Sequence, residues 1–392
     1  MADANTKYDI VVFGASGYTG RLVAEYLQQE YAHTELNWAM AGRSLEKLAS
    51  VRTALGIPDS VELVSVDSDD ATSVRQMVSD CKVVITTVGP YQLYGEELIR
   101  QCAEQGTDYV DLSGEPSWMH ETIAQHSAAA KDSGARIVHS CGFDSIPFDL
   151  GVYYLQQHAI SQTGKPIATV KGRVRAMNGT FSGGTIASMR ATMASAQANP
   201  GIIKVLTNPF ALTEGFTGPE QPTGAAPQYD EELNSWSAPF IMAAINTKNI
   251  HRSNFLLGHQ YGEDFRYDEM LLTGDGEQGK AAADYVAKDD SIGKSDLQPG
   301  EGPTQEEREN GNYDALFAGQ NCEGELMISS VQGDRDPGYG STSKMLAEAA
   351  ICLLENPALA AGGLWTPAAA LGQALIDRLE AHAGLTFQIE KG

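Results

Sequence analysis

The stretch YDIVVFGASGYTG, residues 8–20, decides the fold of this chain. The apolar run Ile10–Phe13 is typical of a parallel strand that is covered on both faces. Three glycines follow the run. Gly14 permits a tight exit from the strand, Gly17 lets backbone N–H groups approach a phosphate, and Gly20 lets the next helix pack against the sheet. A glycine-rich turn without a ligand is the alternative, but the position between a strand and a helix favours a bound dinucleotide.

A second stretch, AGRS at residues 41–44, indicates which dinucleotide is bound. Enzymes that use NAD usually carry an acidic residue at the end of the second strand, where it holds the ribose hydroxyls. Arg43 and Ser44 stand there instead, and a guanidinium beside a hydroxyl suits the 2′-phosphate of NADP(H). Ser44 is also a suitable N-cap for the following helix, and both roles can hold together. We therefore predict NADP(H) as the cofactor.

Residues 8 to about 150 alternate between apolar runs and amphipathic segments, which is the pattern of a doubly wound parallel sheet, an α/β Rossmann domain. The expected strands are Ile10–Phe13, Leu36–Ala41, Val61–Val66, Val83–Val88, Tyr109–Leu112 and Ile137–Ser140. The expected helices cover about residues 17–31, 44–55, 70–80, 95–106 and 117–133. Such sheets bind their ligands at the carboxyl ends of the strands.

These strand ends extend the predicted cofactor site beyond the glycine turn. Asp67 and Ser68 are expected near the adenine, and Val88–Pro90 near the nicotinamide, although Gly89–Pro90 is equally compatible with a plain turn. The predicted cofactor-binding residues are Gly14, Ser16, Gly17, Tyr18, Thr19, Gly20, Arg43, Ser44, Asp67, Ser68, Val88, Gly89 and Pro90.

The composition limits the possible partners. The chain has 27 Lys and Arg against 51 Asp and Glu, a net charge of −24 that disfavours nucleic-acid binding. Its five cysteines contain no C-x-x-C pair and its eight histidines show no metal-ligand spacing, so we predict neither a disulfide framework nor a metal site. We see no signal peptide and no apolar run long enough to cross a bilayer. We therefore expect a cytoplasmic protein without a transmembrane segment.

After about residue 150 the pattern changes to that of an α+β domain. Strands are expected at Thr169–Met177, Asn254–Leu257, Phe265–Leu272 and Glu325–Val331, and helices at Thr185–Ala198, Thr342–Leu354 and Ala368–Ala383. Residues 199–239 are rich in Pro, Gly and Thr and have little periodicity, which predicts a mobile loop or lid. Residues 287–312 are polar and predict a surface excursion. The predicted domains are 1–150, 151–335 and 336–392.

Motifs spread along nearly the whole chain resemble the saccharopine dehydrogenase-like oxidoreductases, in particular the branch that includes the bacterial trans-acting enoyl reductases. They are FGASGYTG at 13–20, AGRS at 41–44, TTVGPYQLYGE at 86–96, YVDLSGE at 109–115, HSCGFDSIPFDLG at 139–151, FSGGTIASM at 181–189, HRSN at 251–254, YGEDFRYDE at 261–269 and DPGYGSTSKMLAEAA at 336–350.

The resemblance implies a Rossmann domain interrupted by an α+β domain that carries the substrate and often a dimer contact, so a homodimer is possible. It also implies C-terminal helices that return to the Rossmann domain. Residues 142–147 look like the counterpart of the GLDPGI-type segment of saccharopine-forming enzymes, but substitutions by Phe, Ser and Pro depart from it and put amino-acid chemistry in doubt. The enoyl reductase branch implies reduction of carbon–carbon double bonds on lipid or polyketide intermediates.

Reduction of an enoyl group requires a proton source and a group that stabilises an oxyanion. The predicted catalytic residues are Tyr91, Tyr94 and Asp144, which lie just after strand ends. The tyrosines have packing as their alternative role, and Asp144 has capping of the helix that starts near Ser145. The predicted contacts to an acyl or other small-molecule substrate are Ser113, Glu115, Phe143, Thr185 and Arg252.

Two other functions stay open at this point. One is an imine or amino-acid reductase or dehydrogenase of the saccharopine type, and the other is a non-catalytic module that senses nucleotides or associates with lipids. The shape of the pocket separates the first of these from an enoyl reductase. A long apolar channel beside the nicotinamide would favour an acyl chain, whereas a small pocket lined by arginines would favour an amino acid.

Overall fold

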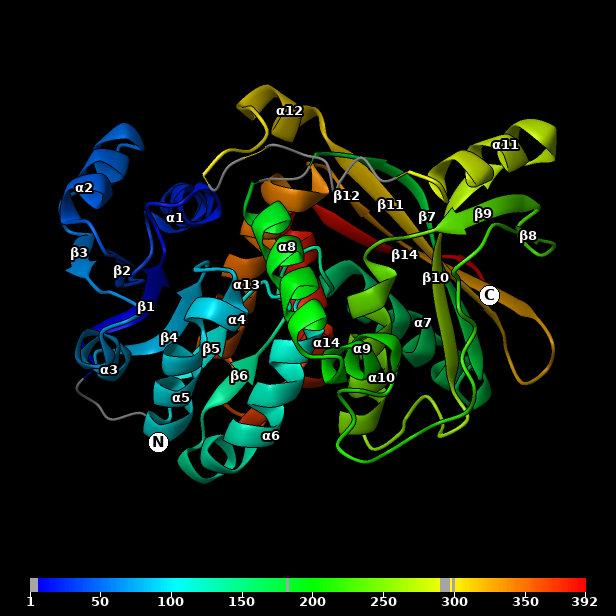
Figure 1. The fold of residues 1–392 in the computed structure, drawn as a ribbon, viewed down its shortest axis with the longest axis horizontal. Helices are drawn as coiled ribbons and strands as arrows, with labels where there is room; N and C mark the ends of the chain where they lie inside the picture. Colours follow the sequence, from blue (N-terminus) through cyan, green and yellow to red (C-terminus); the bar gives the residue numbers. More distant parts are fainter. Residues whose placement is uncertain (1–5, 181–182, 290–296, 298–299) are drawn as a thin grey trace.

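The computed structural model describes residues 6–180, 183–289, 297 and 300–392. It contains two seven-stranded sheets, with helices between and around them (Figure 1). No helix of this described part is both long and apolar enough to cross a membrane.

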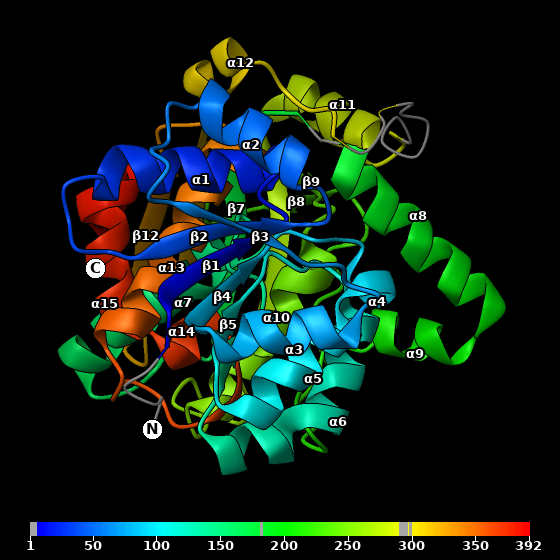
Figure 2. The ribbon, with the colours of Figure 1, turned by 90° about the vertical axis from the view of Figure 1, so that its left-hand side faces the viewer.

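The first sheet is parallel throughout, in the order β3-β2-β1-β4-β5-β6-β13. Its strands are β1 (Tyr8–Phe13), β2 (Trp38–Gly42), β3 (Glu62–Ser65), β4 (Cys81–Thr86), β5 (Asp108–Val110), β6 (Arg136–Val138) and β13 (Gly363–Trp365). The connecting helices are α1 (Tyr18–Tyr31), α2 (Leu45–Ala54), α3 (Ala71–Ser79), α4 (Tyr91–Tyr94), α5 (Glu96–Gln105) and α6 (Pro116–Ser133). Figure 2 shows α1 and α2 on one face of the sheet and α3, α5 and α6 on the other. The predicted doubly wound sheet is confirmed.

The second sheet is mixed, in the order β14-β12-β11-β7-β10-β9-β8, and only β7 and β10 pair in parallel. Its strands are β7 (Thr169–Asn178), β8 (Gln228–Asp230), β9 (Ser235–Pro239), β10 (Arg266–Gly274), β11 (Asn312–Gln320), β12 (Leu326–Gly333) and β14 (Leu385–Lys391). The accompanying helices are α7 (Ile146–Thr163), α8 (Gly183–Ala198), α9 (Gly201–Thr207), α10 (Ala243–Leu256), α11 (Gly276–Val286) and α12 (Gln305–Asn310).

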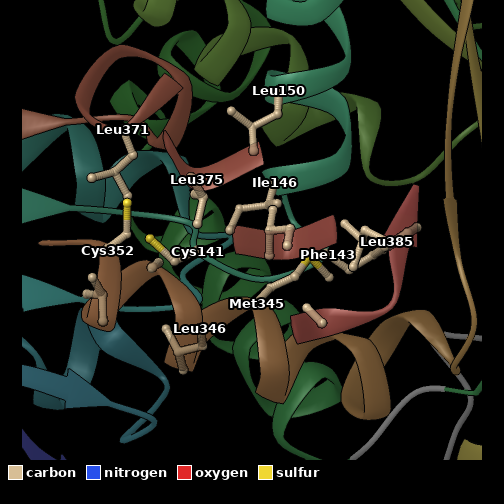
Figure 3. Close-up of a cluster of buried hydrophobic side chains, with 14 of the residues drawn as sticks. Cys141, Phe143, Ile146, Leu150, Met345, Leu346, Cys352, Leu371, Leu375 and Leu385 are labelled. Carbon is tan, nitrogen blue, oxygen red and sulfur yellow. The ribbon is translucent and has the colours of Figure 1, made fainter. Parts of the chain in front are cut away.

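The C-terminal segment contacts both sheets. The helix α13 (Thr342–Glu355) packs against β4 and β5 of the first sheet, and the short helices α14 (Pro367–Ala370) and α15 (Gly372–Arg378) pack on α7. Its two strands complete the sheets, β13 beside β6 and β14 beside β12. Figure 3 shows the resulting core, in which Ile146 and Leu150 of α7 lie near Met345 and Leu375. The predicted domain limits stay a prediction, and α7 spans the first of them.

One predicted strand is wrong, because Asn254–Leu257 forms the last turn and the C-cap of α10. Lys248, Asn249 and Arg252 are buried in this helix although they are polar, so its sequence shows no amphipathic period. Their polar groups are satisfied by distant partners: the Lys248 ammonium donates to Leu206 O at 2.7 Å, and the Arg252 guanidinium donates to Leu364 O at 2.8 Å. Those partners cannot be read from the local sequence.

The expectation of an irregular segment at residues 199–239 is also wrong, because it contains α9, β8 and β9. β9 is ordered by pairing with β10, and the end of α9 is held by the bond from Lys248 to Leu206 O. In the predicted surface excursion, residues 290–296 and 298–299 lie outside the described residues. Its described part includes α12, which begins at a capping box formed by Thr304 and Glu307.

Candidate functional site

The glycine turn has the geometry of a phosphate-binding loop. Gly14 has a φ of +91°, which favours glycine, and Gly17 is exposed at the N-terminus of α1. A Cβ on Gly20 would lie 2.7 Å from the carbonyl carbon of Gly14 and 2.8 Å from Thr87 Oγ1, so only glycine lets α1 approach this closely. The exposed first turn of α1 is free of acidic side chains and can accept a pyrophosphate.

The side chain of Tyr18 takes part in protein contacts at this turn. Its hydroxyl donates to Pro303 O and accepts from the Arg308 guanidinium at 3.0 Å, and its ring meets Tyr339 edge-on at 5.2 Å. Tyr18 thereby joins α1 to the segment before α12. Because the side chain of Tyr18 is engaged in these contacts, its predicted contact with the cofactor would come from its backbone. Ser16 lies half-buried in the turn, and Thr19 lines the main cavity described below.

The residues predicted to select NADP(H) lie at the end of β2. Arg43 is exposed and makes no hydrogen bond or ion pair within the described residues, so its guanidinium can bind a phosphate. Ser44 accepts a hydrogen bond from Lys47 N at 3.2 Å, which confirms its role as the N-cap of α2. A serine hydroxyl that accepts this bond still has a hydrogen to donate. The residues present therefore fit a 2′-phosphate.

The other predicted cofactor residues stand at neighbouring strand ends. Asp67 and Ser68 follow β3 and are half-buried, and an Asp67 carboxylate oxygen accepts from Asp69 N at 3.2 Å. Val88 and the cis peptide bond Gly89–Pro90 lie between β4 and α4. Gly89 lines the main cavity.

A cavity of about 310 Å³ opens at the carboxyl ends of β1, β4 and β5, and we call it the main cavity because it adjoins the glycine turn at Thr19. Helix α8 and the segment 241–245 form its opposite wall. Its lining residues are Thr19, Thr87, Gly89, Tyr91, Leu112, Gly114, Glu115, Pro116, Asp144, Gly184, Thr185, Ser188, Met189, Thr192, Met193, Leu206, Ile241, Met242, Ala244, Ile245 and Tyr339. None of these described lining residues is Lys or Arg.

A smaller cavity of about 80 Å³ adjoins the main one. It is lined mainly by apolar side chains, among them Phe143, Met177 and Phe240. The predicted substrate contact Phe143 thus faces this smaller cavity, where it packs edge-on against Phe148 and Tyr313.

Tyr91 and Tyr94, predicted as catalytic, occupy different environments. Tyr91 is 4 % exposed, and its hydroxyl donates to Thr86 O at 3.1 Å and accepts from Leu112 N at 3.3 Å. Burial raises the pKa of Tyr91 well above its usual value. These contacts fit a packing role. Tyr94 is 39 % exposed on α4 and is not among the described residues that line either cavity.

Glu115 and Ser113, predicted to contact substrate, hold the loops around the cavity. The Glu115 carboxylate accepts from Tyr91 N at 2.9 Å and Gln92 N at 2.8 Å at the start of α4, and from Ser188 Oγ of α8 at 2.9 Å. Ser113 is fully buried, and its hydroxyl accepts from Glu115 N at 3.2 Å. Glu115 therefore ties α8 to the strand ends.

Asp144 is the one carboxyl of the main cavity without a hydrogen-bond partner among the described residues. The predicted capping role is wrong, because the N-cap of α7 is Ser145 and no side chain caps this helix. Asp144 is half-buried, and burial raises its pKa to about 7. It therefore carries a proton in a substantial fraction of molecules near neutral pH.

The last two residues predicted to contact substrate, Thr185 and Arg252, differ in whether their side chains reach a cavity. Thr185 lies at the start of α8 and lines both cavities, with its hydroxyl 2.9 Å from that of Tyr339. Arg252 is 2 % exposed and donates to Leu212 O and Leu364 O, so its guanidinium is engaged in the interior and not available to an anionic head group.

Sequence reasoning missed most of the apolar wall. Met193 of α8, together with Ile241 and Met242, lines the main cavity, and no local motif marks these residues; Met189 closes the motif at 181–189 but had no assigned role. Tyr339, a weak candidate in the motif at 336–350, is the lining residue most distant in sequence from the glycine turn. The described residues include no group of three or more His, Cys, Asp or Glu placed to hold a metal.

Fold, turn and cavity together define an NADP-dependent oxidoreductase, and the comparisons agree. Residues 10–138 match the family model described as saccharopine dehydrogenase NADP binding domain. A trans-acting enoyl reductase of Mycobacterium bovis is 33% identical over 410 residues, covering 97% of each chain. A Mycobacterium tuberculosis protein, provisionally named for the same activity, is 37% identical over 416 residues and 99% of each chain. The chain belongs to the saccharopine dehydrogenase-like family, on its trans-acting enoyl reductase branch.

A solved structure of saccharopine dehydrogenase (L-Glu forming) from Saccharomyces cerevisiae covers 98% of this chain and aligns over 100% of its own length. The TM-score is 0.54 at 11% sequence identity. The two proteins therefore share the arrangement of sheets.

Proposed function

We propose that this protein reduces the carbon–carbon double bond of an α,β-unsaturated acyl substrate with NADPH. The main cavity carries the proposal. It opens where the nicotinamide is expected, its wall is rich in Met, Leu and Ile, and none of its described lining residues is a cation. Such a wall suits an acyl chain, and methionines adapt to chains of varied shape. The enoyl reductases related over nearly the full chain support the same reaction class.

The main cavity also holds the acid that this reaction needs. NADPH, when bound, supplies a hydride to the β-carbon of the substrate. The electron pair of the double bond then moves toward the carbonyl oxygen, and the α-carbon requires a proton. We assign Asp144 to this step, because its carboxyl faces the cavity without a hydrogen-bond partner among the described residues and retains a proton near pH 7. Asp144 would recover the proton from solvent.

Saccharopine-type chemistry is disfavoured by the same wall. An amino-acid substrate carries carboxylates that need cationic or multiple N–H partners once they are buried. Arg252, the predicted anchor for an anionic group, is engaged elsewhere. The two carboxyls that do line the cavity, Asp144 and Glu115, would repel a carboxylate in their ionised forms.

The test is oxidation of NADPH by the purified protein with trans-2-enoyl thioesters, compared with a keto acid plus lysine or another amine. We expect turnover with the thioesters only. Asp144→Asn should abolish turnover while NADPH still binds, and kcat/KM of the wild type should fall above about pH 7 as Asp144 ionises. Turnover only with the keto acid and amine would refute the proposal, and tight NADPH binding without turnover in either panel would favour a nucleotide-sensing or lipid-associated module.

We further propose a homodimer through the second sheet, from the family resemblance, and a cytoplasmic location, from the five free cysteines. Sedimentation of the purified chain and fractionation of cells that produce it test these two points.

A further inference from the structure

The main and smaller cavities meet at a ring of shared residues, which we call the neck. The residues that line both cavities are Leu112, Asp144, Thr185, Ile241, Met242 and Tyr339. Three of them are apolar, and the other three bring one carboxyl and two hydroxyls to the same place. The neck is therefore where a polar group of an otherwise apolar ligand can be held.

Tyr339 is fixed in position from two sides. Its backbone N donates to an Asp336 carboxylate oxygen at 3.0 Å, within the short turn η2 (Pro337–Ser341), and its ring meets Tyr18 of the glycine turn edge-on at 5.2 Å. The ring is 4 % exposed. Its hydroxyl is thus held at a set distance from the phosphate-binding turn, with little freedom to lose when a ligand binds.

Thr185 completes a pair of hydroxyls at the neck. Its Oγ1 lies 2.9 Å from the Tyr339 hydroxyl, so one of the two donates to the other. Each hydroxyl has one hydrogen, so the link between the two uses one of them and leaves at most one for donation to a ligand atom. The Asp144 carboxyl lines the same neck.

We propose that the linked hydroxyls of Tyr339 and Thr185 bind the carbonyl oxygen of the α,β-unsaturated acyl substrate, with Thr185 donating to Tyr339 and Tyr339 donating to the oxygen, and so stabilise the negative charge that forms on it. The inference rests on the proposed function. Hydride addition to the β-carbon breaks the C=C π bond, and the electron pair is delocalised onto the carbonyl oxygen as an enolate. A proton from Asp144 then forms the C–H bond at the α-carbon and restores the C=O bond. A neutral hydroxyl donor that is itself hydrogen-bonded, in a mainly apolar cavity, stabilises such an oxyanion strongly.

The substrate class follows from this arrangement. It is an enoyl group conjugated to a carbonyl, such as a thioester, with the carbonyl at the neck and apolar carbon chain along the Met-rich wall of the main cavity. An isolated double bond without a conjugated carbonyl would give the hydroxyls nothing to hold and should not be reduced.

The test compares steady-state kinetics of three variants with a trans-2-enoyl thioester. We expect Tyr339→Phe to lower kcat about 100-fold, the usual cost of one oxyanion donor, and to leave the Kd of NADPH unchanged. Thr185→Val should lower kcat by roughly tenfold, the equivalent of one hydrogen bond. Thr185→Ser, which keeps the hydroxyl, should recover most of that loss. A residue that only supports the fold would change the Kd of NADPH or the unfolding transition as well.

Tyr261→Phe is the matched control, because Tyr261 is equally buried and its hydroxyl has no partner among the described residues. It should retain wild-type kcat. An active wild type with Tyr339→Phe at unchanged kcat overturns the inference and leaves the proposed function standing. A wild type that oxidises no NADPH with enoyl thioesters overturns both. Loss of activity in Thr185→Ser equal to that in Thr185→Val also contradicts a role for the hydroxyl.

Discussion

Replacing Arg43 by alanine should weaken the binding of NADPH and spare that of NADH. Arg43 is exposed at the carboxyl end of β2 and has no hydrogen bond or ion pair within the described residues. Its removal therefore costs the described part of the protein no hydrogen bond or ion pair, and the free energy of unfolding should change by no more than about 0.5 kcal/mol. Any loss of NADPH binding then reflects the missing phosphate contact.

The size of the effect follows from the exposure of the guanidinium. A hydrogen bond to a charged group contributes roughly 1.5–3 kcal/mol, and screening by solvent places an exposed pair at the lower end of that range. Since 1.4 kcal/mol is a factor of ten, the Kd of NADPH should rise about tenfold. The Kd of NADH, which lacks the 2′-phosphate, should not change. The difference should shrink as the salt concentration rises.

The assay is titration of both reduced cofactors by fluorescence or calorimetry at low and high salt. Arg75→Ala is the matched control, because Arg75 is an exposed arginine in the middle of α3. Arg75→Ala changes the net charge of the protein by the same amount as Arg43→Ala, but Arg75 lies away from the end of β2. Equal weakening of NADPH and NADH by Arg43→Ala, or an equal effect of Arg75→Ala on NADPH, would refute the assignment.

Three further predictions concern stability. Gly20→Ala should lower the free energy of unfolding by about 1–3 kcal/mol in urea titrations, because its Cβ would lie 2.7 Å from the carbonyl carbon of Gly14, whereas Gly42→Ala, with its nearest neighbour at 3.6 Å, should cost much less. Glu115→Ala should cost roughly 1–3 kcal/mol, since two N–H groups at the start of α4 lose their acceptor; an unchanged unfolding midpoint would contradict this. Burial, and to a lesser degree the nearby Lys248, lower the pKa of His251 from 6.5 to about 3. As the pH falls through this range the unfolded chain binds a proton before the folded one does, so the free energy of unfolding should decrease. His251→Phe should make the unfolding temperature less dependent on pH in this range.

The cofactor-binding part of the site could be predicted because the residues that mark it lie close together in the sequence. The run Ile10–Phe13, the three glycines and Arg43 all lie within one strand–turn–helix–strand unit, and each residue type is demanded by its own backbone conformation or by the ligand. The N-cap Ser44 belongs to the same class of signal, since its bond to Lys47 N spans three residues.

The substrate-binding part of the site could not be predicted in this way, because its residues come from segments far apart in the sequence. The buried Lys248 and Arg252 gave α10 a polar sequence, and their partners lie in other elements. The predicted cap Asp144 faces the cavity because the chain turns at Ser145, one residue later than the polar pattern suggests. Tyr339 and Met242 reach the neck from distant segments, so only the folded chain shows that they meet Asp144 there.

The strands β13 and β14 have a consequence for how the protein is made. One closes the parallel sheet beside β6 and the other closes the mixed sheet beside β12, although both are among the last parts of this sequence to be synthesised. Neither sheet can be complete while residues 363–391 are still inside the ribosome. We therefore expect both sheets to reach their final form only after residue 391 has left the ribosome, and a chain cut at residue 335 to yield two fragments with unpaired sheet edges that aggregate.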